Sequence, residues 1–108
     1  MLGRFYREAG RTAIVAGMRL GYFTQPVHPP AKDYRQVLQE DRAAILLADE
    51  LGYAEAFIGE HITDRAEPIT SNLMFIASLA HEATKITFGT AAVTLPSYHP
   101  AMVAGMSQ

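Results

Sequence analysis

Two kinds of hydrophobic pattern alternate along this chain. Short apolar runs, of the kind typical of buried parallel strands, recur at three places and are separated by longer segments. The runs predict strands over residues 19–24, 55–59 and 86–93, the last of them interrupted by Gly89. The chain therefore repeats one strand and one longer segment about every 30 to 35 residues.

The segment after the first strand has the period of an amphipathic helix. Its positions at helical spacing are apolar except for one aspartate: Val37, Leu38, Asp41, Ala44, Ile45, Ala48 and Leu51. Asp33 is placed to cap the start of this helix, with Gln36 three residues later as in a capping box. Gly52 stands where a helix commonly ends.

Two further helices follow the second and third strands. Thr70 or Ser71 caps the second helix, and its predicted apolar face is made of small and branched residues: Leu73, Met74, Ile76, Ala77 and Ala80. The third is predicted over residues 101–108. Together the elements give a βαβαβα order, which favours parallel strands joined by right-handed crossovers.

This order predicts an α/β fold, namely about three βα units from the N-terminal portion of a (β/α)8 TIM barrel, which needs ~250 residues in full. A doubly wound sheet is the competing architecture. No Gly-x-Gly-x-x-Gly follows the first strand and no Walker-type Gly-Lys-Ser occurs, which makes a nucleotide-binding sheet less favoured. We assign residues 18–108 to the partial barrel domain and the more basic residues 1–17 to an N-terminal extension.

Composition narrows the function classes. The chain has 108 residues, of which 49% are hydrophobic, so it can form one small packed domain. Its net charge of -2 argues against a nucleic-acid partner, and no apolar run approaches the ~20 residues that span a bilayer. The absence of cysteine excludes disulfides and thiolate chemistry and fits a cytoplasmic enzyme.

Polar residues gather directly after the predicted strands. The apolar run at 56–58 ends in Glu60 and His61, and three of the four histidines follow strands: His28, His61 and His99. Active sites of parallel α/β barrels lie at the carboxyl ends of the strands, so this clustering predicts a functional face. The fourth, His81, is expected on the surface of the second helix.

His61 is the first candidate for chemistry, because an imidazole exchanges protons near neutral pH. Glu60 either orients His61 or accepts hydrogen bonds from the backbone at the barrel mouth, since adjacent residues of a strand point to opposite faces. A metal site made of Glu60, His61 and Asp64 is disfavoured, because metal-dependent barrels gather ligands from several strands and no His-x-His follows the first strand.

Four segments resemble the bacterial luciferase-like flavin monooxygenases. They are Gly-Glu-His at 59–61, the long run from Gly89 to Pro100, the helix segment 47–53, and Glu-Pro-Ile at 67–69. The resemblance extends from about Met18 to the end of the chain, and the limonene-monooxygenase-like branch is the most similar. It implies a (β/α)8 barrel that binds FMN, reduced by a separate reductase, and uses O2 on a small organic substrate. Because members often dimerise, a homodimer is one expected assembly.

The resemblance also assigns roles to particular residues. His61 matches a histidine beside the flavin, with Glu60 next to it. Thr90, Ala91 and Ala92 match a flavin-contacting segment in which a cis peptide bond joins the last two residues. His99 and Pro100 are expected to shape the loop, and His28 is either solvated or lines the substrate mouth.

Two alternatives stay open at this point. The same barrel also hosts F420-dependent hydride-transfer oxidoreductases, and a non-catalytic fragment or partner subunit would keep the fold without the chemistry. The pattern supplies three of eight expected strands, so the isolated chain is expected to bind flavin poorly and to associate through its bare edges.

Overall fold

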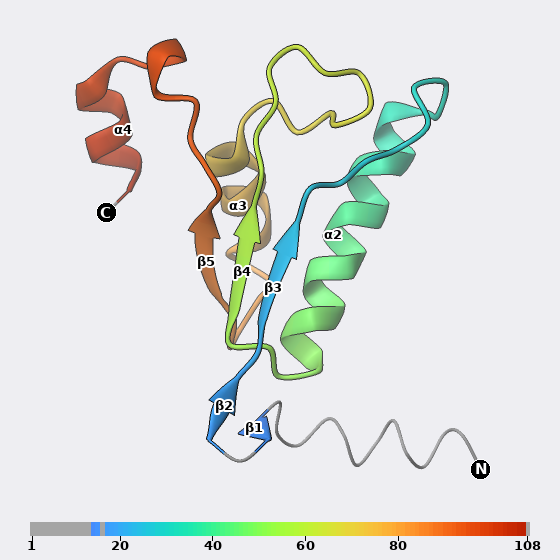
Figure 1. Cartoon of the computed structure of the whole chain (residues 1–108), viewed down its shortest axis with the longest axis vertical. Coiled ribbons are helices and arrows are strands. Elements are labelled where there is room, and N and C mark those ends of the chain that lie inside the picture. Colours follow the sequence, from blue (N-terminus) through green and yellow to red (C-terminus); the bar gives the residue numbers. More distant parts are fainter. Residues whose placement is uncertain (1–13, 16, 108) are drawn as a thin grey trace.

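A three-stranded parallel sheet organises the computed structural model, which describes residues 14–15 and 17–107. Its strands are β3 (Gly21–Thr24), β4 (Glu55–Ile58) and β5 (Thr87–Thr90), in the order β3-β4-β5 (Figure 1). Thr24, Ile58 and Thr90 lie side by side, so all three strands stop at the same level. We call this end of the sheet the carboxyl edge.

Helices cover one face of the sheet. α2 (Tyr34–Glu50) connects β3 to β4, and α3 (Asn72–Leu79) connects β4 to β5 (Figure 1). The core between helices and sheet consists of eight buried residues: Ile45, Ala48, Ala56, Ile58, Ile69, Phe75, Leu79 and Ile86. The short 3-10 helix η1 (Leu95–Ser97) and helix α4 (Pro100–Met106) follow β5. The predicted partial α/β barrel with parallel strands is confirmed.

Among the described residues, no helix covers the opposite face of the sheet. Within β4, Ala56 and Ile58 are buried against the helices, whereas Phe57 between them is exposed. Phe57 pairs with Phe23 on one side and with Gly89 on the other, so these three residues form a row across this face. A side chain at Gly89 would overlap the Phe57 ring, because a Cβ there would lie 2.5 Å from its nearest atom.

The helix boundaries follow the predicted signals. Asp33 caps α2 and accepts a hydrogen bond from the Gln36 backbone N–H at 3.0 Å. The Gln36 side chain donates to Glu40, so only half of the capping box forms. Gly52 has a φ of +81°, the left-handed conformation expected just past a helix end, and Ser71 is the residue that caps α3.

The predicted strand ends are wrong in two places. The first strand breaks at Leu20: its beginning forms β2 (Met18–Arg19), which pairs antiparallel with β1 (Ile14–Val15). β1 falls inside the predicted extension, the rest of which is mostly outside the described residues. The third strand ends at Thr90 instead of 93, because beyond Ala91 the backbone bonds to the side chains of Asn72 and Glu60 rather than to a neighbouring strand.

The predicted face of α3 and the position of His81 are also wrong. The buried residues of α3 are Asn72, Phe75 and Leu79, while Met74 is 73% exposed. Apolar residues surround this helix on most sides, so hydrophobic periodicity alone does not identify the packed face. His81 lies in an exposed turn, because α3 ends at Leu79.

Candidate functional site

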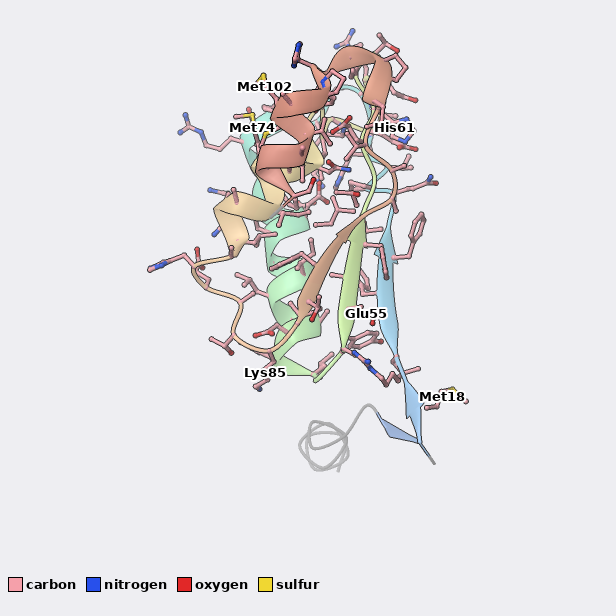
Figure 2. All side chains as sticks on the ribbon, turned by 90° about the vertical axis from the view of Figure 1, so that its left-hand side faces the viewer. Met18, Glu55, His61, Met74, Lys85 and Met102 are labelled. Atoms are coloured by element: carbon pink, nitrogen blue, oxygen red, sulfur yellow. The ribbon has the colours of Figure 1, made fainter. Side chains whose placement is uncertain are left out.

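The carboxyl edge brings together the segments that the sequence marked as chemical. The Gly59 N–H donates to the Thr24 carbonyl at 3.1 Å, and the Ala91 N–H donates to the Ile58 carbonyl at 2.9 Å. The parallel ladder therefore continues one residue beyond β4 and β5. His61 lies beyond this edge, at the opposite end of the sheet from Glu55 (Figure 2). The residues following β4 and β5 thus leave the sheet at the same end.

Glu60 is a buried carboxylate, only 7% exposed, which connects three parts of the chain. It accepts hydrogen bonds from the Asn72 N–H at 3.1 Å, the Thr94 N–H at 2.9 Å and the Tyr98 hydroxyl at 2.9 Å. These donors belong to the start of α3 and to the segment after β5. The sequence left two roles open for Glu60: orienting His61, or accepting hydrogen bonds from the backbone. In the structure Glu60 accepts hydrogen bonds from the backbone at the carboxyl edge.

Asn72 completes this group of side chains. It is fully buried, and its Nδ2 donates to the carbonyls of Ile58 and Ala92, both at 3.2 Å. We call Glu60, Asn72 and the half-buried Tyr98 the buried anchor. Because the buried anchor bonds to residues 92 and 94, it fixes the backbone that follows β5 against the end of β4.

The buried anchor keeps Glu60 ionised. Burial alone would raise the pKa of Glu60, but hydrogen bonds from the backbone of Thr94 and Asn72 and from the Tyr98 hydroxyl outweigh it, so the pKa is lowered from 4.5. Near neutral pH the side chain is therefore a hydrogen-bond acceptor with no proton to give. A carboxylate held in this way is suited to positioning its neighbours.

His61 has different surroundings from its neighbour Glu60. Its side chain is 39% exposed, and its Nε2 lies 2.5 Å from Oε2 of Glu67, whose side chain is 15% exposed. The distance is that of an ion pair, while the orientation is not that of a hydrogen bond, so the two side chains attract as opposite charges only when the imidazole is protonated. In the described part of the chain, no hydrogen bond joins the side chains of Glu60 and His61.

The segment expected to contact flavin begins at the last residue of β5. The peptide bond between Ala91 and Ala92 is cis, as the resemblance implied. Strand alternation places Thr90 on the same face as Phe88, which packs against the core, and Ala91 on the face of Gly89. Small residues thus line the edge on the uncovered side, and a cofactor contact from Thr90 would involve its backbone.

The comparisons with known proteins agree with this geometry. The profile of the luciferase-like monooxygenase family matches residues 18–107. The chain belongs to the luciferase-like monooxygenase family. Its predicted membership is confirmed by a match covering most of the sequence, including all three strands of the parallel sheet.

Several relatives of this luciferase-like chain are monooxygenases. It is 38% identical over 84 residues to 4-hydroxyprotoasukamycin monooxygenase of Streptomyces nodosus subsp. asukaensis, covering 78% of this chain and 23% of the relative. It is 34% identical over 84 residues to limonene 1,2-monooxygenase of Rhodococcus erythropolis, covering 78% and 22%. The chain therefore spans under a quarter of the length of these curated relatives.

A solved structure supports the same fold assignment. The oxygenating constituent of 3,6-diketocamphane monooxygenase from Pseudomonas putida, described as a type II Baeyer-Villiger monooxygenase in complex with FMN, matches with a TM-score of 0.77 and 30% identity. The match covers 82% of this chain and 24% of that one.

No helix in the described part of the luciferase-like chain has the length and apolarity to cross a membrane.

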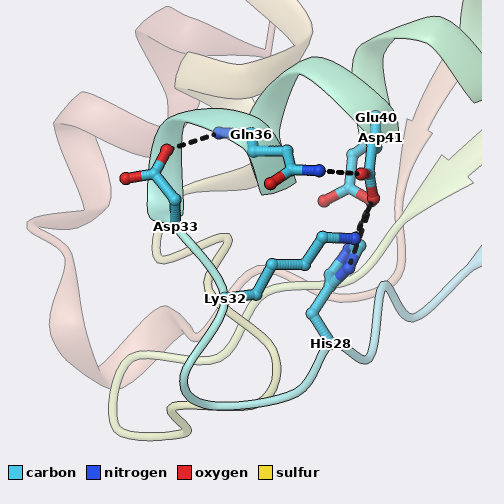
Figure 3. A network of polar contacts seen from close by, with 6 residues as sticks. All are labelled: His28, Lys32, Asp33, Gln36, Glu40 and Asp41. Carbon is cyan, nitrogen blue, oxygen red and sulfur yellow. Dashed lines mark hydrogen bonds and ion pairs between the residues drawn. The ribbon is translucent and has the colours of Figure 1, made fainter.

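The other loop histidines of this luciferase-like chain are engaged in the fold. His28 is not simply solvated: its side chain is 14% exposed, and its Nε2 lies 2.8 Å from Oδ1 of Asp41 in a hydrogen bond (Figure 3). Asp41 is the one polar residue on the predicted apolar side of α2, and its hydrogen bond with His28 accounts for its place there. His28 also lines a cavity of about 350 Å³, together with Lys32 and Arg65.

His99 has the expected structural role. It caps α4, and its Nδ1 accepts a hydrogen bond from the Ala101 N–H at 3.2 Å. Pro100 occupies the first helical position, where its missing N–H leaves no donor unsatisfied.

Three important residues escaped the sequence analysis: Asn72, Tyr98 and Glu67. Asn72 lay next to the predicted cap, where a polar residue is ordinary, so burial gave no sequence signal. Tyr98 and Glu67 were within recognised family segments but had no partner in the sequence. Tyr98 contacts Glu60, 38 residues away in sequence, and Glu67 contacts His61, six residues away. Only the folded backbone brings these side chains together.

Proposed function

We propose that this chain provides carboxyl-edge residues of a flavin-dependent monooxygenase that uses reduced FMN and O2 on a small organic substrate. The observation that carries the proposal is that β4 and β5 deliver His61 and the Ala91–Ala92 backbone to one end of the sheet. The FMN complex of the diketocamphane relative supports the choice of cofactor. It favours FMN over F420.

The residues at the edge fit a flat aromatic cofactor. Gly59 already lies against its neighbours, since a Cβ there would be 3.4 Å from the Thr24 carbonyl and 3.8 Å from that of Ala91. Phe23 and Phe57 expose 58% and 38% of their surface on the uncovered face just below. Small residues at the rim and aromatic rings beneath it leave an apolar surface for one face of an isoalloxazine ring.

Each residue then has a distinct task. The bound flavin supplies the activation of O2, which side chains cannot perform. His61 exchanges a proton with the substrate or the cofactor, and the backbone of Ala91 and Ala92 contacts the ring, with Thr90 beginning this segment. Glu60 holds these residues in register through the buried anchor, so we propose a positioning role for it rather than direct proton transfer.

The remaining partners follow from this chemistry. A separate reductase supplies the reduced flavin. O2 and a small organic substrate meet the cofactor at the carboxyl edge. We also propose that the protein assembles as a homodimer.

Anaerobic titration of the isotopically labelled chain with reduced FMN tests the cofactor proposal. We expect weak binding, with NMR shift changes concentrated at the amides of His61, Ala91 and Ala92 and absent at the Glu50 end of α2. Shift changes confined to α2, or none at millimolar FMN, would contradict the proposal. Ala91→Val should weaken these changes by crowding the ring, whereas Ala101→Val, at an exposed position of α4, should not.

A further inference from the structure

We propose that Glu67 is the positioning residue for His61, holding its Nε2 side and leaving Nδ1 as the nitrogen that exchanges protons. The proposal rests on the proposed function of His61 and extends it to a residue outside the recognised Gly-Glu-His step. Its starting observation is the 2.5 Å separation between His61 Nε2 and Glu67 Oε2.

The burial of Glu67 makes its contact with His61 important for the carboxylate. Oε2 of Glu67 is buried and accepts no hydrogen bond within the described part of the chain. A buried carboxylate oxygen without a donor is unfavourable unless a positive group or an N–H lies against it. The His61 imidazole is the group at that distance, so each side chain restricts the other.

The loop between β4 and α3 is closed in a way that maintains the contact. The His61 N–H donates to the Ile69 carbonyl at 3.0 Å, and Ile69 is itself buried in the core at 3% exposure. This bond brackets the segment that contains Glu67. The backbone on either side of Glu67 is therefore held to the packed part of the molecule, while the imidazole stays 39% exposed.

The chemistry of imidazole then distinguishes its two nitrogens. A neutral imidazole carries a proton on one nitrogen and a lone pair on the other. A carboxylate oxygen 2.5 Å from Nε2 favours the proton on that nitrogen, because a protonated ring nitrogen is the positive end of the neutral imidazole's dipole and an unprotonated one is the negative end. Nδ1, for which the described residues offer no partner, is left to accept a proton from a substrate or cofactor.

The chain contains a matched control for this pair. His28 also has a carboxylate at its Nε2, from Asp41, but there both side chains are largely buried and the contact is a hydrogen bond (Figure 3). Glu67→Gln should therefore change His61 alone, and Asp41→Asn should change His28 alone. Each variant serves as the other's control for general effects on the fold.

Two-bond 1H–15N spectra of the histidine side chains, recorded on the labelled chain at pH 8, test the proposal. In the unaltered chain we expect His61 to carry its proton mainly on Nε2. In Glu67→Gln the nitrogen shifts should move toward each other as the tautomer ratio falls several-fold. Backbone amide spectra check that the variant is folded.

Two outcomes would overturn the proposal. One is a His61 proton mainly on Nδ1 in the unaltered chain, a measurement that needs no variant to fold. The other is a folded Glu67→Gln chain whose His61 signals match those of the unaltered chain. Neither measurement uses flavin, so a failure of FMN binding would count against the proposed function and leave this result separate.

Discussion

Two buried acids lie at opposite ends of the same sheet and do different work. Asp49, near the end of α2, accepts hydrogen bonds from the backbone N–H groups of Thr84, Lys85 and Ile86 at 2.7 to 3.1 Å. It thereby fixes the segment that enters β5. Glu60 fixes the segment that leaves β5, through Thr94 and the rest of the buried anchor.

The difference lies in what stands next to each acid. Asp49 bonds to one segment of the chain, as expected for a group that only stabilises the fold. Glu60 bonds to two segments, the start of α3 and the chain after β5, and is followed in sequence by His61, which remains partly exposed. The same arrangement, a buried carboxylate bonded to backbone N–H groups, stabilises the fold at one end of the sheet and, in the proposed function, positions the flavin-contacting segment at the other.

Replacing Asp49 should have the largest effect on stability. Asp49→Ala leaves three backbone donors without their charged acceptor, that of Ile86 being buried, so we expect a loss of about 3 kcal/mol in the free energy of unfolding. Urea unfolding followed by circular dichroism measures it. Glu50→Ala, at an exposed position of the same helix, is the control and should change stability by less than about 0.5 kcal/mol. A small loss for both variants would show that Asp49 is not an anchor.

Glu60→Gln should cost somewhat less and should act at the other end of the sheet. The amide keeps one acceptor oxygen but places an NH2 group against donors, so we expect a loss of about 2 kcal/mol. Amide shifts should change at residues 91–94 and stay constant at 84–86. Asp49→Asn should give the reverse pattern. If both variants changed the amide shifts of the same residues, the two ends of the sheet would be coupled, and Asp49 and Glu60 would not act separately.

Acid should weaken both ends together. Backbone hydrogen bonds outweigh burial and lower the pKa of Asp49 and of Glu60 below their ordinary values of 3.8 and 4.5. The unfolded chain therefore binds these protons first as the pH falls. The stabilisation is complete above about pH 4.5 and is lost as the pH drops through the folded-state pKa values, with a slope of at most about 1.4 kcal/mol per pH unit for each acid.

Urea midpoints measured between pH 2.5 and 7 test this dependence. The part of the slope that these two acids contribute should fall by about half in Glu60→Gln, because one of the two titrating groups is removed, and should disappear in the double variant with Asp49→Asn. An unchanged slope in the double variant would assign the acid sensitivity to other carboxylates.

The sequence predicted the elements far better than the contacts between them. Periodicity and capping residues located β4, α2 and the cap at Asp33, since these depend on neighbours a few residues away. It also placed His61 and Ala91 at one edge, because parallel strands end together. It could not show that Asn72 is buried, because that burial is decided by the backbone after β5.

Glu60 illustrates the boundary between the two kinds of prediction. The alternation of a strand predicts that Glu60 and His61 face opposite ways, and the structure agrees, with one side chain buried and the other partly exposed. Alternation cannot say which of the two faces the helices. The burial of Ile58 against the helices decides this: Glu60, two residues later, faces the same side, and His61 faces the other.

Tyr98→Phe should have the smallest effect and the most specific one. The Tyr98 hydroxyl donates to Glu60 Oε2 at 2.9 Å, while the two backbone donors to Glu60 do not depend on it. Its removal should therefore cost about 1 kcal/mol, measured by urea unfolding, and should raise the pKa of Glu60, measured by 13C NMR of the carboxyl carbon. Tyr34→Phe, whose exposed hydroxyl donates to the Pro68 carbonyl at 3.3 Å, is the control and should leave that pKa unchanged. If Tyr98→Phe also left it unchanged, the anchor would consist of backbone bonds alone, and Glu60 would resemble Asp49 more closely than we infer.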